Sequence, residues 1–542
     1  MAPTPNDSEE PGVLRPRAIR GAIDAFVDRP HLALDRTPSS LSSGRSTPVA
    51  EDAPPSVHSI SNVRKQVRAQ VKQRMFYNID YQPRLSHFDP NSDHRDFHGF
   101  FVLFWISLVI MVITTVLRNI KDTGYPLRVH VWSLLSANVI ELAFVDLAMV
   151  ASTAVTVPLH KVIRRSKGLL RWGMGGMFVQ SLYQFAWLSF WVILPFKLDW
   201  TWTSQVFLTL HSLVFLMKMH SYAFYNGHLS ETERRLSALD KPQAKAYPAA
   251  VHYPRSPSVA DGANPANGDA DSPDSEPDTK RDVGKLRADL AMELTSPLGR
   301  VTYPQNLTWK NYIEFIFFPT LCYELEYPRT KDRSWIEVLI KAAAVFGCIF
   351  LLTLTSEEFI VPVLSDSAFR LRTIPSHFER GLILAETISM LLFPFMVTFL
   401  LVFLVIFEYV LGAFAEITRF ADRRFYSDWW NSCDWLEFSR KWNLPVHHFL
   451  RRHVYFSSLT RFSAPGAMAI TFLVSSIAHE LVLVCITKKW RGYGFFAMMM
   501  QLPIVAVQRS KFVKGRKTFN NICFWTSMIL GLSLICALYV LI

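Results

Sequence analysis

The stretch FYSDWWN at residues 425–431 is the most informative part of this chain. Two tryptophans beside an aspartate and an asparagine are typical of a polar loop at a membrane surface. We therefore expect Phe425, Trp429 and Trp430 to embed in the membrane interface, with the polar side chains of the stretch bonding locally. The alternative is an ordinary aromatic belt. We expect the stretch to shape a binding mouth and to have no chemical step of its own.

A histidine inside an apolar segment is the second feature. His479 lies in SSIAHEL, residues 475–481, 48 residues after the heptapeptide ends. An ionisable residue in such a segment is costly and indicates a functional site. Burial favours the uncharged imidazole, which can act as a general base. A histidine bonded across helices for packing fits the position equally well. Glu480 could orient His479, or it could be protonated or paired for structural reasons.

The composition predicts an all-α multi-pass membrane protein. Half of the residues are apolar and 13% are aromatic. Several apolar blocks exceed the roughly 18 residues that a helix needs to span a bilayer. We expect about nine transmembrane helices, near residues 98–117, 133–157, 168–196, 201–224, 335–355, 381–411, 465–487, 493–508 and 520–542. The long block 381–411 should be tilted or broken at Pro394.

Polar segments divide the chain. Residues 1–95 are predicted to be largely disordered, apart from a short basic amphipathic helix near 62–76 that could bind an anionic membrane, dock on a partner or be merely solvated. Helices 1–4 should occupy 96–228 and helices 5–9 should occupy 301–542. The segment between them, 229–300, is expected to be a disordered cytosolic loop. No cleaved signal peptide is indicated.

Basic residues in short loops predict the orientation of the chain. They favour a cytosolic N-terminus and a lumenal C-terminus, although Lys488, Lys489 and Arg491 oppose the trend. The loop 412–464, which carries the heptapeptide, should then face the cytosol. The six cysteines have no CxxC spacing, so no zinc site or disulfide framework is predicted.

The heptapeptide followed by the histidine resembles the two hallmarks of the membrane-bound O-acyltransferases, in particular their fungal sterol branch. WNLPVH at 442–447 is similar to a further element of that family, and the resemblance covers about residues 98–542. It implies an internal reaction chamber that holds the catalytic histidine on helix 7. The motif residues that match are Phe425, Tyr426, Asp428, Trp429, Trp430 and Asn431.

The resemblance also implies the roles of individual residues. His479 would be the catalytic base, Asn443 would polarise the thioester carbonyl, and Trp442 would shape the pocket. Read without the family, Trp442 and Asn443 simply mark a helix boundary. The implied acyl-CoA contacts are Arg440, Trp442, Asn443, His447, Tyr455 and Ser475.

Other positions in this loop could contribute to coenzyme A binding, because its negatively charged phosphates require cationic side chains. Lys441, Arg451 and Arg452 share the same loop, although each could be an ordinary positive-inside charge. Glu437 and Ala464 depart from the family pattern, where an asparagine and a lysine stand, so Arg461 could substitute as a phosphate contact. His98, at the start of the first helix, is a candidate sterol contact.

The resemblance implies an acyl-CoA:sterol O-acyltransferase of the endoplasmic reticulum membrane. Its expected partners are long-chain acyl-CoA, a sterol such as ergosterol, the lipid bilayer and a second copy, as a homodimer or dimer of dimers. No nucleic acid, metal or cofactor is expected. A diacylglycerol O-acyltransferase is the main alternative. A transporter that uses His479 and Glu480 as an ion relay is the remote one, since no internal repeat is evident and a relay gives the heptapeptide no role.

Overall fold

The computed structural model describes residues 79, 81–88, 98–128, 130–240, 278–297, 299–510, 513 and 515–542. All of them belong to one compact unit, Val67–Ile542. The amphipathic helix predicted near 62–76 lies outside the described residues.

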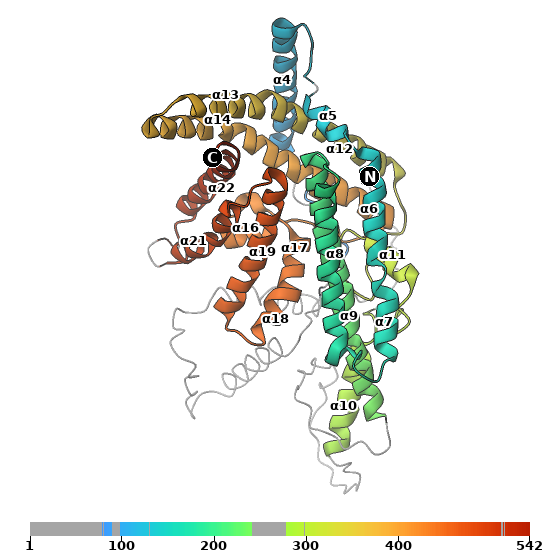
Figure 1. Cartoon of the computed structure of the whole chain (residues 1–542). Helices are drawn as coiled ribbons and strands as arrows, with labels where there is room; N and C mark the ends of the chain where they lie inside the picture. The colour runs from blue at the N-terminus through green and yellow to red at the C-terminus, as the bar shows by residue number, and fades with distance from the viewer. Residues whose placement is uncertain are drawn as a thin grey trace, which may run out of the picture. The chain divides into compact units, whose positions relative to one another are not determined.

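The described part of the chain is helical and contains no β-strand, only three isolated β-bridges. The all-α prediction is confirmed (Figure 1). The α-helices are α4 (His98–Thr123), α5 (His130–Ser136), α6 (Val139–Thr153), α7 (Thr156–Arg165), α8 (Met177–Lys197), α9 (Trp202–Leu239), α10 (Asp278–Glu293), α11 (Trp309–Phe317), α12 (Trp335–Thr355), α13 (Val361–Thr373), α14 (His377–Phe403), α15 (Leu411–Thr418), α16 (Trp435–Lys441), α17 (Leu444–Phe449), α18 (Phe456–Leu459), α19 (Ala464–Thr487), α20 (Tyr493–Met499), α21 (Gln501–Gln508) and α22 (Lys517–Leu541).

Short π-helical turns continue or join several of these helices. They are η1 (Trp172–Gly176), η2 (Ser356–Ile360), η3 (Leu404–Val410) and η5 (Leu450–Tyr455), while η4 (Trp429–Asn431) is a 3₁₀ turn. Segment 381–411 is predicted to be tilted or broken at Pro394, and the break is not found, because α14 runs through that residue without interruption. The irregular turn comes ten residues later, at η3, where a π-bulge carries Glu408.

Seven helical segments in the described ranges are long and apolar enough to cross a membrane. They are Gly99–Thr123, His130–Arg165, Trp172–Lys197, Trp335–Thr373, His377–Thr418, Ala464–Thr487 and Thr518–Leu541. The expected count of nine is therefore not confirmed. The predicted span 201–224 lies in α9, which is 38 residues long and buries many polar side chains. The predicted span 493–508 forms two short helices, α20 and α21, which together are shorter than a typical spanning helix.

The prediction of a disordered 229–300 loop is wrong at both of its ends. Helix α9 continues to Leu239, and α10 packs against it. Glu293 on α10 receives hydrogen bonds from His228 Nε2 (2.6 Å) and Thr232 Oγ1 (3.4 Å). The prediction of a disordered 1–95 segment also fails for residues 81–88, which are packed onto the rest of the molecule.

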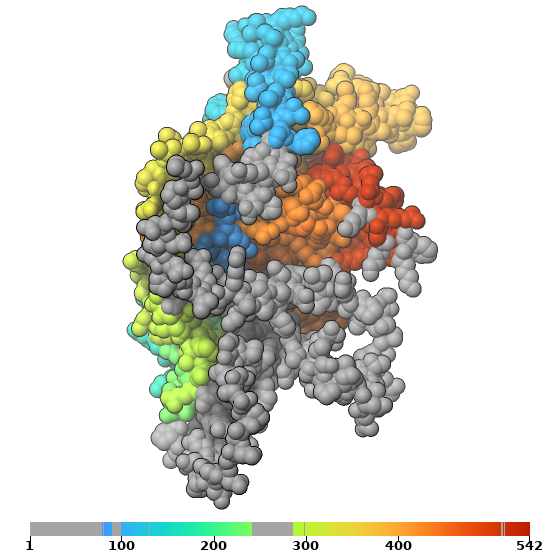
Figure 2. Space-filling view, turned by 180° about the vertical axis from the view of Figure 1, so that it is seen from behind, coloured from blue at the N-terminus to red at the C-terminus, as the bar shows by residue number. Residues whose placement is uncertain are grey.

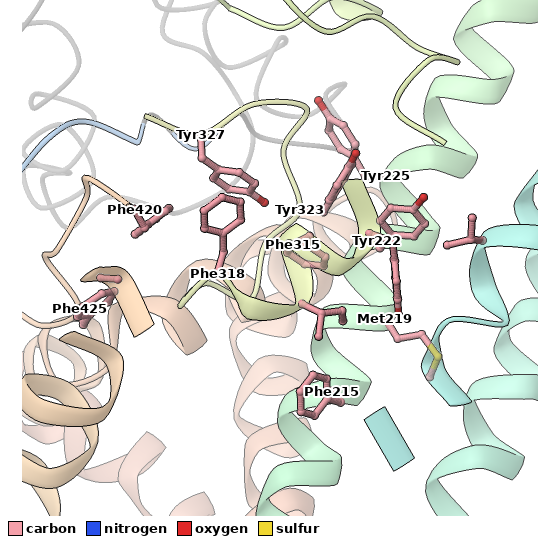
Figure 3. Packing of buried hydrophobic residues seen from close by; sticks show 14 of the residues in the cluster. Phe215, Met219, Tyr222, Tyr225, Phe315, Phe318, Tyr323, Tyr327, Phe420 and Phe425 are labelled. Atoms are coloured by element: carbon pink, nitrogen blue, oxygen red, sulfur yellow. The ribbon is translucent and has the colours of Figure 1, made fainter. Parts of the chain in front are cut away.

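An aromatic core joins the middle of the chain to its C-terminal half. Tyr222 on α9 meets the ring of Tyr323 edge-on at 4.8 Å, and Phe315 on α11 lies 5.1 Å from the same tyrosine (Figure 3). The ring of Phe318 then packs 5.6 Å from Phe420, five residues before the heptapeptide. These rings are almost fully buried, so they fix the heptapeptide segment relative to α9 and α11.

Candidate active site

Helix α19 carries His479. The helix begins after Ser463 with a proline in its first turn, where the missing N–H costs nothing, and it ends at Lys488 in the left-handed conformation. His479 is its sixteenth residue, about 22 Å from its start at 1.5 Å per residue. The helix packs against α20, α9, η5 and α18 (Figure 1).

The imidazole of His479 is exposed and is held by its own helix. Its Nδ1 lies 2.8 Å from the carbonyl oxygen of Ser475, and the Ser475 hydroxyl lies 3.5 Å away. A carbonyl oxygen can only accept, so Nδ1 carries the proton and Nε2 of the neutral ring keeps its lone pair. In that form of the ring, Nε2 is the nitrogen that a general base would use to accept a proton.

Glu480 does not orient His479, which corrects one of the two interpretations of this carboxylate. Its buried carboxylate accepts from the backbone N–H groups of Gly492 (2.8 Å) and Phe495 (3.0 Å) and from Tyr539 Oη (2.7 Å). Neighbouring residues on a helix point about 100° apart, so Glu480 faces α20 and α22 instead. Its role is structural: it ties three C-terminal helices together.

Asn443 caps helix α17. Its Oδ1 accepts a hydrogen bond from the backbone N–H of Val446 at 3.1 Å, as a typical N-cap side chain does. The bond fixes the amide plane, and the Nδ2 group has no partner among the described residues. An oriented N–H donor with no partner is what an oxyanion site needs. Helix α17 leads directly into η5, which packs on α19.

The heptapeptide holds the segment around Asn443 through its backbone. Ser427 N donates to the carbonyl of Lys441 at 2.8 Å, and Leu444 N donates to the carbonyl of Phe425 at 3.0 Å. These two bonds bracket Trp442 and Asn443. The heptapeptide thus sets the position of the candidate oxyanion donor.

The aromatic residues of the heptapeptide lie inside the protein, so the expectation that they embed in the membrane interface is wrong for Phe425 and Trp429. Both are about 97–98% buried within the core, and Tyr426 is buried equally well. Trp429 meets Trp442 edge-on at 4.9 Å, and Trp442 stacks on Phe399 at 4.4 Å. Only Trp430 is half-exposed. The packing makes this stretch a structural support for Trp442.

The polar residues of the heptapeptide bond locally, as predicted for Asp428. Its Oδ1 accepts from the Ser427 hydroxyl (2.9 Å) and lies 3.2 Å from Lys441 Nζ. Burial acts to raise the pKa of Asp428, but these two partners outweigh it and the pKa is lowered. Lys441 also bonds Glu437 at 2.8 Å, so the departure from the family pattern at 437 neutralises a cation next to the site. The side chain of Asn431 is exposed, and no local side-chain bond is found for it.

The five cations of this loop differ in availability. Arg452 is buried and pairs with Glu324 at 2.8 Å, and Lys441 is paired as described, so neither is free for a phosphate. Arg451 lies over the ring of Phe456. Arg440 on α16 and Arg461 before α19 have no side-chain partner among the described residues. Of the five predicted phosphate-binding cations, Arg440 and Arg461 therefore remain as candidates.

The remaining predicted positions lie on nearby elements. His447 on α17 and Tyr455 at the end of η5 are half-buried, while Ala464 is exposed at the first position of α19. His98 begins α4, but its side chain lies outside the described residues. The structure brings together Ser475 and His479, and separately Trp442, Asn443 and the heptapeptide. It records no direct bond between His479 and Asn443.

Sequence reasoning missed Glu408, which lies 7% exposed in η3. Tyr426 of the heptapeptide donates to its Oε2 at 3.0 Å, and Lys341 on α12 lies 3.7 Å from its Oε1. The signal was present: Glu408 is an acidic residue inside the apolar block 381–411.

Two apolar cavities in the described part of the molecule are lined by neither His479 nor Asn443. One, of about 110 Å³, lies between α14 and α22 and is lined by Phe399 and Trp525, which also contact the tryptophans of the site. The other, of about 340 Å³, lies between α4 and α12. Their linings are apolar, so neither has polar groups for a reaction step.

Comparison with known proteins gives a family. The model of MBOAT, the membrane-bound O-acyltransferase family, matches residues 103–541. The chain is 40% identical over 469 residues to the probable sterol O-acyltransferase 2 of Schizosaccharomyces pombe, covering 85% of this chain and 91% of that protein. It is 35% identical to the sterol O-acyltransferase 2 of Candida albicans, covering 82% and 75%. Similarity to the diacylglycerol O-acyltransferase 1 of Dictyostelium discoideum is 33%, over 47% of this chain and 40% of that protein.

Proposed function

The chain belongs to the membrane-bound O-acyltransferase family, and we propose that it transfers a long-chain acyl group from acyl-CoA to the 3β-hydroxyl of a membrane sterol. The observation that carries this proposal is the similarity to fungal sterol O-acyltransferases over more than four-fifths of the chain. The diacylglycerol enzyme matches less than half of it. A transporter finds no support in these relatives.

In the proposed reaction His479 acts as the base. Its Nε2 accepts the proton of the sterol hydroxyl while that oxygen attacks the thioester carbon. The carbonyl electrons move onto the carbonyl oxygen, and Nδ2 of Asn443 donates a hydrogen bond to the developing negative charge. When the tetrahedral intermediate collapses, the carbon–sulfur bond breaks, and the sulfur takes the proton back from His479. The products are a sterol ester and free coenzyme A.

The two substrates are proposed to reach the site from different sides. Arg440 and Arg461 are the proposed contacts for the phosphates of coenzyme A, because both lack a protein counterion among the described residues. The sterol would arrive through the bilayer. The endoplasmic reticulum location, the cytosolic N-terminus, the lumenal C-terminus and assembly as a homodimer or dimer of dimers belong to the same proposal and rest on the family resemblance and the loop charges. The reaction as written needs no metal or redox cofactor.

Product analysis tests the function. Purified protein in lipid nanodiscs is given radiolabelled oleoyl-CoA with ergosterol, cholesterol or diolein, and the products are separated by thin-layer chromatography. We expect sterol ester. Triacylglycerol as the main product would overturn the sterol assignment and keep the acyltransferase assignment.

Two variants of α19 test whether ester formation depends on His479 as the base. His479→Ala should lower kcat by about 10²–10⁴-fold, the usual contribution of general base catalysis, with an unchanged melting temperature. Ile477→Ala, an exposed position of the same helix, should keep full activity. Full activity in a folded His479→Ala protein would refute the mechanism.

A further inference from the structure

Residues 81–88, which we call the strap, lie across the segment that leads into the heptapeptide. Arg84 forms a two-pronged ion pair with Asp422, with bonds of 3.0 and 2.5 Å. The backbone of Arg84 also pairs with that segment, since its N–H donates to Ala421 and its carbonyl accepts from Arg423. Figure 2 shows the strap as the darker blue patch beside the orange surface of the C-terminal half. The strap is thus fixed to the molecule at a point more than 300 residues away in sequence.

The strap then contacts the heptapeptide itself through Tyr426. The Ser86 hydroxyl donates to Glu408 Oε2 at 2.5 Å and lies 3.1 Å from Tyr426 Oη, which donates to the same oxygen. His87 stacks on the ring of Tyr426 at 5.4 Å. Both the ring and the hydroxyl of this tyrosine are therefore held by groups from outside the heptapeptide. Burial raises the pKa of Tyr426 well above its usual range, so the hydroxyl stays a donor.

Tyr426 is connected to the candidate oxyanion donor through the backbone of its neighbours. The residues on either side of it, Phe425 and Ser427, make the two backbone bonds that bracket Trp442 and Asn443. A rotation or shift of Tyr426 would move both bonds together. A displacement of about 1 Å at a reacting group is enough to cost a large factor in rate.

We propose that Ser86 and Glu408 are positioning residues of the acyl transfer: through Tyr426 they hold the heptapeptide, and with it Asn443, in the geometry that stabilises the transition state. This inference rests on the proposed role of Asn443. It assigns a purpose to the strap, to the π-bulge η3 and to a buried carboxylate that the reaction itself does not use. Lys341, 3.7 Å away, supplies the charge that makes the carboxylate tolerable in a buried position.

A positioning role is distinguished from a substrate-binding role by measuring kcat and KM separately. Ser86→Ala removes one donor from Glu408 and one contact from Tyr426, while it leaves the acyl-CoA contacts and His479 in place. We expect kcat with oleoyl-CoA to fall by about tenfold, the order expected for one lost bond to a buried carboxylate. The KM for oleoyl-CoA should change by less than about twofold. Ser86→Thr keeps the hydroxyl and should restore most of the rate.

A double-mutant cycle tests whether the effect passes through Tyr426. Tyr426→Phe keeps the ring and removes the hydroxyl, and it should also lower kcat. The double variant Ser86→Ala with Tyr426→Phe should lose less than the product of the two single losses, because both act on the same carboxylate. Leu85→Ala, an exposed position of the strap, is the matched control and should behave like the wild type.

The outcomes separate this inference from the function proposed above. Sterol ester formed at the wild-type rate by well-folded Ser86→Ala overturns the positioning role and leaves the enzyme assignment intact. A fall in kcat that Ser86→Thr does not restore, or a fully multiplicative double variant, overturns it as well. Where Ser86→Ala does not fold, Tyr426→Phe decides instead, because an unchanged kcat in that variant would also reject the positioning role. No ester from wild-type protein would defeat the proposed function itself.

Discussion

Asn443 uses the two ends of its amide for two purposes. The oxygen caps α17 through Val446, and the nitrogen is the proposed hydrogen-bond donor to the substrate. The cap makes the donor rigid, because rotation of the amide would break the bond to the helix. A rigid donor needs no reorganisation when negative charge develops on the substrate.

Asn443→Asp separates these two functions. The carboxylate still accepts from Val446 N, so the helix cap and the melting temperature should be maintained. The donor is lost and a negative charge replaces it, so kcat for sterol esterification should fall by at least about 10²–10³-fold. Thermal unfolding and initial rates on the same purified sample measure both quantities.

Two further variants control for charge and for the cap. Asn443→Ser also caps α17 but is uncharged, and its hydroxyl is too short to reach the same point, so kcat should fall without loss of stability. Asn443→Ala should lose both the rate and about 1 kcal/mol of stability. Should Asn443→Asp retain the wild-type kcat, Asn443 is a structural cap alone.

Single residues show what a sequence can and cannot predict. The position of His479 in an apolar helix was visible, because an ionisable residue there stands out. The partner of Glu480 was not, because the sequence defines the direction in which a side chain leaves its helix but not the element that faces it. Trp429 was misplaced for the same reason: a tryptophan pair fits a membrane interface and a buried core equally well by composition.

The cations on α16 and on η5 have different roles. Arg440 on α16 is half-buried with no counterion among the described residues, whereas Arg452 on η5 is 1% exposed and bonded to Glu324 and to the carbonyl of Tyr323. Arg452 also lies 4.8 Å above the ring of Tyr225. One cation is therefore available to a ligand, and the other joins η5 to the core.

Arg440→Ala and Arg452→Met should have opposite effects. The first should raise the KM for acyl-CoA several-fold and leave the melting temperature unchanged, because it removes the proposed contact to a phosphate. The second removes the cation that pairs with Glu324, which is only partly exposed, and this loss should cost about 3–5 kcal/mol of unfolding free energy. Its KM should stay near the wild-type value in whatever fraction remains folded. Steady-state kinetics and thermal unfolding of both variants decide between the roles, and a stable Arg452→Met protein with a raised KM would reverse the assignment of Arg452.

Helices could be predicted where their residues follow a regular hydrophobic pattern. Long apolar helices such as α4, α14 and α19 follow from hydropathy, because a bilayer requires about 20 apolar residues in a row. Helix α9 extends beyond its predicted end. The sequence did not indicate this extension, because buried polar residues interrupt the amphipathic pattern of the helix. The strap has no periodicity, and its partners at 408, 422 and 426 lie more than 300 residues away, so no local rule identifies it.

At the scale of the whole molecule, a buried polar cluster joins α8, α9 and η5. His453 Nε2 lies 2.9 Å from Ser221 Oγ, and Ser221 also accepts from the backbone N–H of Tyr323. His220 lies edge-on to His453 at 5.2 Å and reaches Gln184 on α8 at 3.0 Å. Both His211 and His220 bond across helices, to Asp146 and Gln184 respectively. Helices from the two halves of the chain therefore meet at groups that must remain hydrogen-bonded.

This cluster should make the stability of the folded protein depend on pH. Burial, and to a lesser extent His220 and Arg452, lower the pKa of His453 well below its usual value near 6.5. The unfolded chain then binds a proton that the folded chain does not, so stability is fully present above about pH 6.5 and falls by about 1.4 kcal/mol per pH unit below it. Thermal unfolding of the detergent-purified protein between pH 8 and 5 should show this loss. His453→Gln keeps an acceptor for Ser221 and cannot be protonated, so its melting temperature should fall less steeply over the same range. An equal slope in the two proteins would show that His453 does not link the halves of the molecule in its neutral form.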